Sequence, residues 1–198
     1  EVLFTLAMHI DWCKLRLRDR DLPGAHHRWL QRLGLVNFSH TDKPVAWLHA
    51  VSLGEARLSI PLLENLLVDY SQYQWCVTTT TLTGSQTISE HFGYRVWHCY
   101  CPYDAGWTTR LFLKRLQPKC FFVMETECWP NTYQACLRRG IPIVLLNARL
   151  SEKSQQRYRR IKALLPGLWR ACAHIAAQTE DYRQLFIALG APADRVST

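Results

Sequence analysis

The chain of 198 residues has no run of about 18 apolar residues, so no complete transmembrane helix lies within it. It contains only nine glycines and nine prolines, which excludes collagen-like and low-complexity chains. We find no internal repeat with a period of about 20–50 residues, which excludes a solenoid or a propeller. With 48% apolar, 12% aromatic and 20% charged residues, the sequence predicts one globular domain rather than a disordered chain.

The signatures of several common sites are also missing. No C-x-x-C pair occurs among the eight cysteines, and several of them lie in apolar runs, so we expect free, buried thiols. There is no G-x-G-x-x-G, no P-loop and no G-x-S-x-G, which leaves dinucleotide, nucleoside triphosphate and serine hydrolase sites unsupported. Cys99 and Cys101 share one face of a predicted strand and His98 points the other way. Further ligands at metal-binding spacing are lacking, so we expect core packing and no metal.

Positive charge is in excess, with 24 Lys and Arg against 16 Asp and Glu, a net charge of +8 and a pI near 9.2. This balance favours an anionic partner, which can be a phosphorylated ligand, an anionic membrane or nucleic acid. One basic group starts at Arg149 and continues along a predicted helix. Aromatic residues are not interleaved with it, which argues against single-stranded nucleic acid.

From about residue 45, apolar runs rich in β-branched residues alternate with amphipathic runs. This pattern predicts a Rossmann-like α/β domain over residues 41–198, a parallel sheet with helices on both faces. We expect Asp104 to cap the third helix and Gly140 to follow the fourth. The predicted strands are 45–51, 75–80, 95–101, 119–124, 141–146 and 174–177, and the predicted helices are 55–69, 83–92, 105–116, 131–139, 151–164 and 180–189.

Residues 1–40 do not follow this alternation. An apolar stretch over 2–13 precedes a basic run that ends at Arg28 and Arg32. Two interpretations stay open: a membrane-proximal helical segment, or a helix packed on the domain with a solvated basic face. The first residue is not methionine and the last residues resemble the start of a strand, so we expect a piece of a longer protein.

Ligands of doubly wound sheets bind beyond the carboxyl ends of the strands. The first such loop contains Ser52, Gly54 and Glu55. We expect Gly54 to permit a tight turn close to a ligand. Glu55, in the first turn of the next helix and at the rim of the cleft, is placed to act as a general base. The competing interpretation is a carboxylate that only complements the helix dipole, which would also favour its ionised form.

Two further loops carry polar side chains in the same position. Glu125 and Glu127 follow a very apolar strand, where two acids are costly unless they are paired or functional. If the strand continues through them, both point to one side and their repulsion raises one pKa; capping of the next helix is the alternative. Thr80, Gly84 and Ser85 lie in a hydroxyl-rich strand end that suits phosphate or sugar hydroxyls, or forms an ordinary helix cap.

Together these segments resemble the 3-deoxy-D-manno-octulosonic acid (Kdo) transferases of lipopolysaccharide synthesis. The resemblance covers the chain from about residue 25, and its motifs occur in the family's order. They are H-A-V-S-L-G-E at 49–55, T-T-T with T-G-S within 78–85, C-P-Y-D at 101–104, M-E-T-E-C-W-P-N at 124–131 and N-A-R-L-S at 147–151.

This resemblance implies the N-terminal, acceptor-binding half of a GT-B glycosyltransferase, without its C-terminal donor-binding domain. It implies transfer of Kdo from CMP-Kdo to a lipid A precursor at the cytoplasmic face of the inner membrane, with no cofactor and no nucleic acid partner. Glu55 would be the base, and Glu125 would stabilise the transition state. Another sugar donor, or a non-enzymatic module that binds anionic lipid or nucleic acid, stays open. The residues expected to bind substrate are Ser52, Gly54, Thr80, Gly84, Ser85, Glu127, Asn131 and Arg149.

Overall fold

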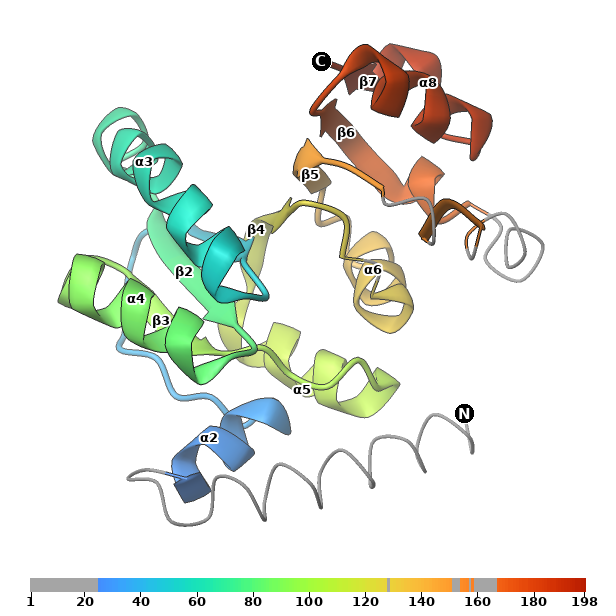
Figure 1. Cartoon of the computed structure of the whole chain (residues 1–198). Coiled ribbons are helices and arrows are strands. Elements are labelled where there is room, and N and C mark those ends of the chain that lie inside the picture. Colours follow the sequence, from blue (N-terminus) through green and yellow to red (C-terminus); the bar gives the residue numbers. More distant parts are fainter. Residues whose placement is uncertain (1–24, 128, 151–153, 157, 159–166) are drawn as a thin grey trace.

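The computed structural model describes residues 25–127, 129–150, 154–156, 158 and 167–198 (Figure 1). Seven strands form one sheet in the order β3-β2-β1-β4-β5-β6-β7, and every neighbouring pair is parallel. The sequence prediction of a Rossmann-like parallel sheet is therefore confirmed. The strands are β1 (Val45–His49), β2 (Gln74–Thr79), β3 (Trp97–Tyr100), β4 (Pro118–Met124), β5 (Ile143–Ala148), β6 (Cys172–Ala177) and β7 (Val196–Ser197).

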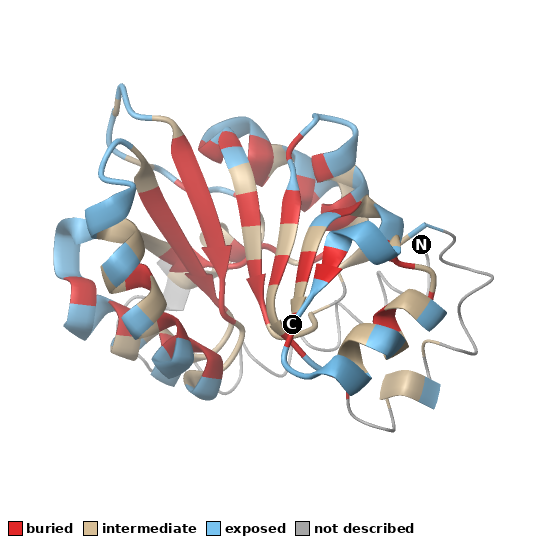
Figure 2. Cartoon of the chain, turned by 90° about the horizontal axis from the view of Figure 1, so that it is seen from above, coloured by how far each residue is buried: buried red, intermediate tan, exposed pale blue. Residues whose placement is uncertain are grey.

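Helices cover both faces of the sheet, as its buried centre in Figure 2 illustrates. Side chains alternate along β1, so Trp47 packs into one apolar cluster while Ala46 and Leu48 pack into the other. The Trp47 cluster contains residues of α5, α6 and α8, and the opposite cluster contains residues of α3 and α4. The helices are α2 (Ala25–Arg32), α3 (Leu53–Asp69), α4 (Leu82–Phe92), α5 (Gly106–Leu116), α6 (Pro130–Leu137) and α8 (Glu180–Ala188).

Several predicted boundaries were wrong by a few residues. Strand β3 begins at Trp97 rather than at residue 95, because Gly93–Arg95 forms a 3-10 turn after α4. Strand β1 ends at His49, two residues early, because the chain there turns into the cap of α3. Strands β5 and β6 are each shifted by two residues at their beginning. The predicted helix over 151–164 lies largely outside the described residues.

Hydroxyl side chains begin three of the helices. Ser52, Thr81 and Thr179 have extended backbone and accept hydrogen bonds from N–H groups in the first turns of α3, α4 and α8. The prediction that Asp104 caps α5 was wrong. Ala105 holds that position, and the Asp104 carboxylate instead accepts hydrogen bonds at the start of α6, which follows in the sequence but packs alongside α5.

The described part of residues 1–40 packs on the domain. Arg32, at the end of α2, is buried, and its Nη2 donates to the carbonyl of Thr80 at 2.6 Å. Its guanidinium also lies over the Tyr100 ring. The sequence analysis placed Arg32 in a basic run that is either membrane-proximal or on the solvated face of a packed helix. The structure shows that Arg32 itself is not on a solvated face. Residues 1–24 lie outside the described residues, and among those described no helix is long and apolar enough to cross a membrane.

Candidate functional site

The candidate residues gather where the strand order reverses. Strand β1 lies between β2 and β4, and His49 of β1 pairs with Val123 of β4. The segments that follow these two strands therefore leave the same edge side by side, one carrying Glu55 and the other carrying Glu125. In open α/β sheets this switch point is the usual place for a ligand. The topology thus brings the two predicted catalytic carboxylates together.

Glu55 folds back on the beginning of its own helix. Its Oε2 accepts from the backbone N–H of Val51 at 2.8 Å, and its Oε1 accepts from the hydroxyl of Ser52 at 3.0 Å. The Ser52 hydroxyl in turn accepts from the Glu55 N–H at 3.3 Å. This is a variant of the reciprocal capping arrangement. The sequence analysis expected Glu55 at the open rim of the cleft. In the structure it is more buried, with only 6% of the residue exposed.

Burial dominates the electrostatics of Glu55. It raises the pKa of the carboxyl above the usual 4.5, although the hydrogen bonds from Val51 and Ser52 act in the opposite direction. The negative charge of Glu125 adds to the increase. Burial therefore outweighs the groups around Glu55 that favour its ionised form. A carboxylate with a raised pKa accepts a proton more readily.

Glu125 pairs with Arg149 across the ends of β4 and β5. Arg149 Nη2 donates to Glu125 Oε1 at 2.8 Å, with the arginine half-exposed. Glu125 and Asn147 both have left-handed backbone, with φ of 56° and 54°, which side chains other than glycine rarely adopt. Such strain is typical of functional loops. Because β4 ends at Met124, the expected extended alternation through Glu125 does not occur.

Glu127 is the third carboxylate of this edge. Burial, together with the charges of Glu55 and Glu125, raises its pKa to about 7. The sequence predicted a raised pKa for one of the two acids from their mutual repulsion on a continued strand. The strand ends before them, and burial is the largest cause of the raised pKa of Glu127. The Glu127 carboxyl forms no hydrogen bond within the described residues, whereas Glu125 has its arginine. The Glu127 carboxyl is therefore partly protonated near neutral pH.

The raised pKa of Glu127 has a consequence for stability. The folded state favours the protonated acid, so ionising it costs free energy that is fully present above pH 7 and absent below the usual pKa of 4.5. We expect Glu127→Gln to raise the free energy of unfolding by about 2 kcal/mol at pH ~8 and to leave it unchanged at pH ~4. Urea titrations at both pH values measure this difference. Glu90→Gln, at an exposed position of α4, is the control, and a gain that does not depend on pH would contradict the assignment.

The hydroxyl-rich strand end is largely committed to structure. Thr80 donates through its Oγ1 to the Val51 carbonyl at 2.8 Å, which joins the ends of β1 and β2. A Cβ at Gly84 would lie 2.9 Å from Thr81 Oγ1 and 3.4 Å from the Ser52 carbonyl oxygen, so glycine permits a close approach of α3 and α4. Ser85 follows in the first turn of α4. Their predicted contact with substrate stays a prediction.

Gly54 does not have the role expected from the sequence. It lies inside the first turn of α3, exposed, and its φ is outside the left-handed region. A Cβ there would meet only Ser52 Oγ, at 3.8 Å. The turn after β1 therefore does not require glycine at this position. The second part of the prediction, a close approach of a ligand to the backbone, stays open, because the space above Gly54 is unoccupied by other side chains.

Asn131 lies at the start of α6, bound to Asp104. Its Nδ2 donates to the Asp104 carbonyl at 2.7 Å, and its N–H donates to Oδ2 at 3.1 Å. Thr132 donates to Oδ1 through both its N–H and its hydroxyl, each at 2.7 Å. Burial raises the pKa of Asp104 against the effect of these bonds. The Asn131 side chain is thus a structural link, and its contact with substrate stays a prediction.

Sequence reasoning missed two features of the site. Thr126 Oγ1 accepts from the backbone N–H of Arg149 at 3.1 Å and so joins the two loops that carry the Glu125 pair. His49 is fully buried, its Nδ1 lies 2.8 Å from Thr78 Oγ1, and burial lowers its pKa to about 4. A hydroxyl between two acids was the only available signal for the first. His49 begins the 49–55 motif, but nothing local signalled that its ring is buried and lies against Thr78.

No metal centre is evident in the described part of the chain. There, no group of three or more His, Cys, Asp and Glu side chains is arranged to hold an ion. Cys99 and Cys101 lie in the apolar core with Cys76, as free thiols. Burial raises the pKa of both Cys99 and Cys101 well above its usual value, which keeps them protonated.

Comparisons with known proteins relate the chain to one family. Residues 27–198 match the family model for 3-deoxy-D-manno-octulosonic-acid transferase. The chain is 36% identical over 186 residues to the 3-deoxy-D-manno-octulosonic acid transferase of Haemophilus influenzae, covering 93% of this chain and 44% of that protein. It is 35% identical over 144 residues to the enzyme of the same name from Bordetella pertussis, covering 68% and 32%. The chain thus spans less than half the length of these relatives.

A likeness to solved structures supports the fold. The crystal structure of a UDP-GlcNAc 2-epimerase from Neisseria meningitidis superposes with a TM-score of 0.54 at 18% sequence identity. The match covers 77% of this chain and 45% of the epimerase. At this identity the comparison shows a shared α/β architecture and carries no information on substrate.

Proposed function

This chain belongs to the 3-deoxy-D-manno-octulosonic-acid (Kdo) transferase family, and from that premise we propose that it is the acceptor-binding half of a GT-B glycosyltransferase. The reaction transfers Kdo from CMP-Kdo to a lipid A precursor, lipid IVA, at the cytoplasmic face of the inner membrane. One observation carries the proposal: Glu55, Glu125 and Arg149, all within family motifs, converge beyond β1, β4 and β5 at the switch point of the sheet.

Glu55 is the general base in this proposal. It takes the proton of an acceptor hydroxyl while the hydroxyl oxygen attacks the anomeric carbon of Kdo, and CMP leaves with the electrons of the broken bond. A carboxylate offers about four lone pairs. The bonds from Val51 and Ser52 occupy one on each oxygen, so each oxygen keeps one. Because only 6% of Glu55 is exposed, the acceptor hydroxyl has to reach that small exposed edge.

In this proposal Glu125 and Arg149 stabilise charges that the substrates and the transition state carry. A transition state with oxocarbenium character carries positive charge near the anomeric carbon, and a fixed carboxylate such as Glu125 stabilises it. Arg149 is 51% exposed while it holds Glu125, so part of its guanidinium is available to a phosphate or carboxylate of the substrates. The net charge of +8 also suits a bisphosphorylated lipid in an anionic membrane.

The direct test is an assay of the purified full-length protein with CMP-Kdo and tetra-acylated lipid A precursor. The proposal expects a product that carries Kdo. Transfer only from a different nucleotide sugar would instead identify the protein as a GT-B transferase with another donor. Absence of transfer, together with salt-sensitive binding to duplex DNA and no preference for the lipid, would indicate a non-enzymatic module.

Ser52 provides a test of Glu55 that does not alter the carboxylate. Ser52→Ala removes the hydroxyl that donates to Glu55 Oε1 and caps α3. Losing a hydrogen bond to the ionised form raises the pKa of Glu55 further, so we expect the acid limb of the rate profile to move to higher pH. The lost cap should cost about 1 kcal/mol of stability. Initial rates across pH and urea unfolding measure the two effects.

Thr179→Ala is the matched control for this variant. It removes an equivalent hydroxyl cap from α8, far along the chain from Glu55. We expect a similar loss of stability with an unchanged pH profile. If both alanine variants shift the profile equally, the shift comes from general destabilisation and Glu55 does not set the acid limb.

A further inference from the structure

A buried arginine lies beside the carboxyl edge of the sheet without an acidic partner. Only 8% of Arg32 is exposed, and within the described part of the chain no carboxylate lies within 4.0 Å of its guanidinium. The guanidinium lies over the rings of Tyr100 and Tyr103, at 4.9 and 5.9 Å from their centroids. A buried charge without a counter-charge costs stability, and an apolar side chain fills such a space at lower cost. The fold alone therefore does not explain an arginine at this position.

The end of α2 holds Arg32 in a defined place. The Arg32 carbonyl accepts from the Tyr103 N–H at 2.8 Å, and Oε1 of the preceding Gln31 accepts from the Tyr100 N–H at 2.9 Å. Both donors belong to the end of β3 and the segment that follows it. Because these bonds fix the helix end on the sheet, the guanidinium reaches the end of the neighbouring strand β2 from a fixed direction.

A chain of hydrogen bonds leads from Arg32 to the carboxylate of Glu55. Arg32 Nη2 donates to the Thr80 carbonyl at 2.6 Å. The Thr80 N–H and Oγ1 both donate to the Val51 carbonyl, at 3.1 and 2.8 Å. The Val51 N–H in turn donates to Glu55 Oε2 at 2.8 Å. Because β1 ends at His49, Val51 lies beyond the ladder of β1, and its place depends on the bonds from Thr80.

We propose that Arg32 is a positioning residue for proton transfer to Glu55. It holds the Thr80 carbonyl, Thr80 holds Val51, and Val51 holds the carboxylate that accepts the proton. This inference rests on the proposed role of Glu55 as the base. A small displacement of a reacting group lowers a rate strongly, so a contact three residues removed from the reaction affects its rate. The competing role for Arg32 is to anchor α2 to the sheet and nothing more.

The pKa of Glu55 distinguishes these two roles. The hydrogen bond from Val51 acts to lower this pKa. Loosening that bond therefore raises the pKa further, because the ionised carboxylate loses part of a donor. A residue that only anchored α2 would leave the pKa unchanged. Substituting Arg32 leaves in place the charged groups that interact with Glu55, which are Glu125, Glu127 and Arg149.

The test follows the Glu55 carboxyl by NMR titration in the full-length protein with isotope-labelled glutamate, beside kcat and KM for transfer across pH. Arg32→Met keeps an unbranched side chain and removes the donor. We expect it to raise the pKa of Glu55 and to move the acid limb of the rate profile to higher pH. On the plateau, kcat should fall by about tenfold. The KM of the acceptor should stay, because a side chain that is 8% exposed offers a substrate little surface.

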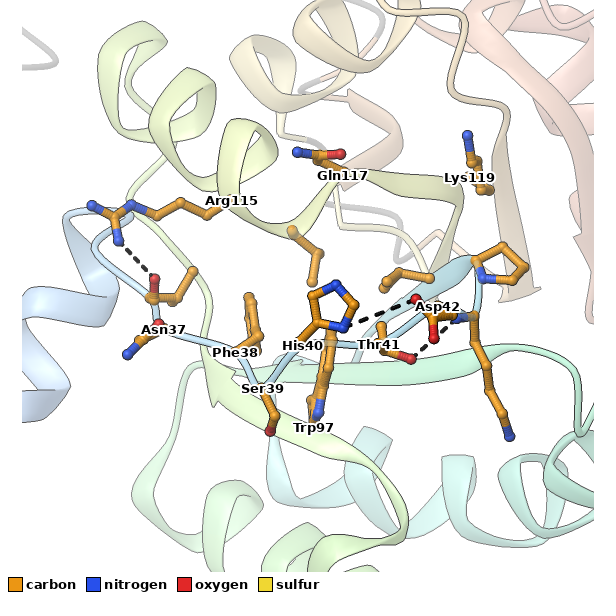
Figure 3. Close-up of a pocket in the computed structure, with 15 residues that line it drawn as sticks. Asn37, Phe38, Ser39, His40, Thr41, Asp42, Trp97, Arg115, Gln117 and Lys119 are labelled. Carbon is orange, nitrogen blue, oxygen red and sulfur yellow. Dashed lines mark hydrogen bonds and ion pairs between the residues drawn. The ribbon is translucent and has the colours of Figure 1, made fainter.

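Thr80→Val tests the middle of the chain without changing charge. It removes the Oγ1 bond to the Val51 carbonyl, so the pKa of Glu55 should again rise. Arg115→Met is the matched control, because Arg115 also lies at a helix end and donates to a backbone carbonyl, that of Val36, at 2.9 Å (Figure 3). Arg115 lies near the beginning of β4, at the opposite edge of the sheet from the glutamates. This variant should leave the pKa of Glu55 and kcat unchanged.

Three results would overturn the proposal. The first is a Glu55 pKa that stays at the wild-type value in Arg32→Met. The second is a rise in Arg32→Met without one in Thr80→Val, which would reduce the effect to the lost charge. The third is an equal rise in Arg115→Met. If Arg32→Met does not fold, the Thr80→Val titration decides alone. The titrations need no transfer, so they are independent of the proposed function, which Glu55→Gln tests: transfer at the wild-type rate by that variant would reject the base itself.

Discussion

Glu55→Gln is expected to lower the rate of Kdo transfer by about 10²–10⁴-fold while the protein still binds CMP-Kdo. A carboxamide cannot take the proton of the acceptor hydroxyl. Its oxygen can still accept from the Val51 N–H, so the beginning of α3 should stay in place. Single-turnover rates report the chemistry, and equilibrium titration with the donor reports binding.

The same variant separates catalysis from capping. If Glu55 only stabilised its helix, the loss would show in unfolding, with the transfer rate unchanged. Glu180→Gln is the matched control, because Glu180 is also in the first turn of a hydroxyl-capped helix but lies on α8. We expect that control to transfer Kdo at the wild-type rate. A Glu55→Gln protein that did the same would exclude Glu55 as the base.

Asp104→Ala is expected to cause the largest loss of stability. The carboxylate is 3% exposed and accepts from the N–H groups of Asn131 and Thr132 and from the Thr132 hydroxyl. Removing it leaves those buried donors unsatisfied, for a cost of about 3–4 kcal/mol. For a domain of this size that corresponds to a fall in Tm of about 10 °C. Thermal and urea unfolding measure it.

Asp104→Asn is the companion variant. The amide keeps one oxygen that can accept from Thr132 but loses the second acceptor, so we expect about half of the alanine effect. If the alanine variant unfolds at the same temperature as wild type, the link from Asp104 to α6 contributes nothing. Because Asn131 is held by the same carboxylate, any change in acceptor KM should follow the stability order of the two variants.

The sheet could be predicted from sequence because its strands are buried on both sides. Apolar runs such as that around Phe121 have no other stable place than between two helical layers. The ends of the strands were predicted less accurately than their positions. A cap or turn at a strand end depends on single contacts, as with the 3-10 turn Gly93–Arg95 before β3. The helix caps Ser52 and Thr81 follow local rules, whereas Asp104 caps a helix that begins 26 residues later.

The candidate site was predictable in its position and not in its detail. Parallel topology alone places Glu55 and Glu125 at one edge, and the family motifs single them out. The burial of Glu55 depends on how its side chain folds back to Val51, which no spacing reveals. The left-handed backbone at Glu125 is equally invisible, because nothing in that residue type favours it. Both features come from tertiary contacts.

Strand β1 has a bearing on how the two carboxylates behave over time. All five of its residues are buried, and it lies in the interior of the sheet between β2 and β4. Backbone in such a position opens only when the whole domain unfolds, while peripheral helices fluctuate on their own. The strand from which the Glu55 loop leaves is therefore among the last parts of the sheet to open. We expect substitutions in the peripheral helices to change the rate of substrate binding more than the geometry of the bound substrate.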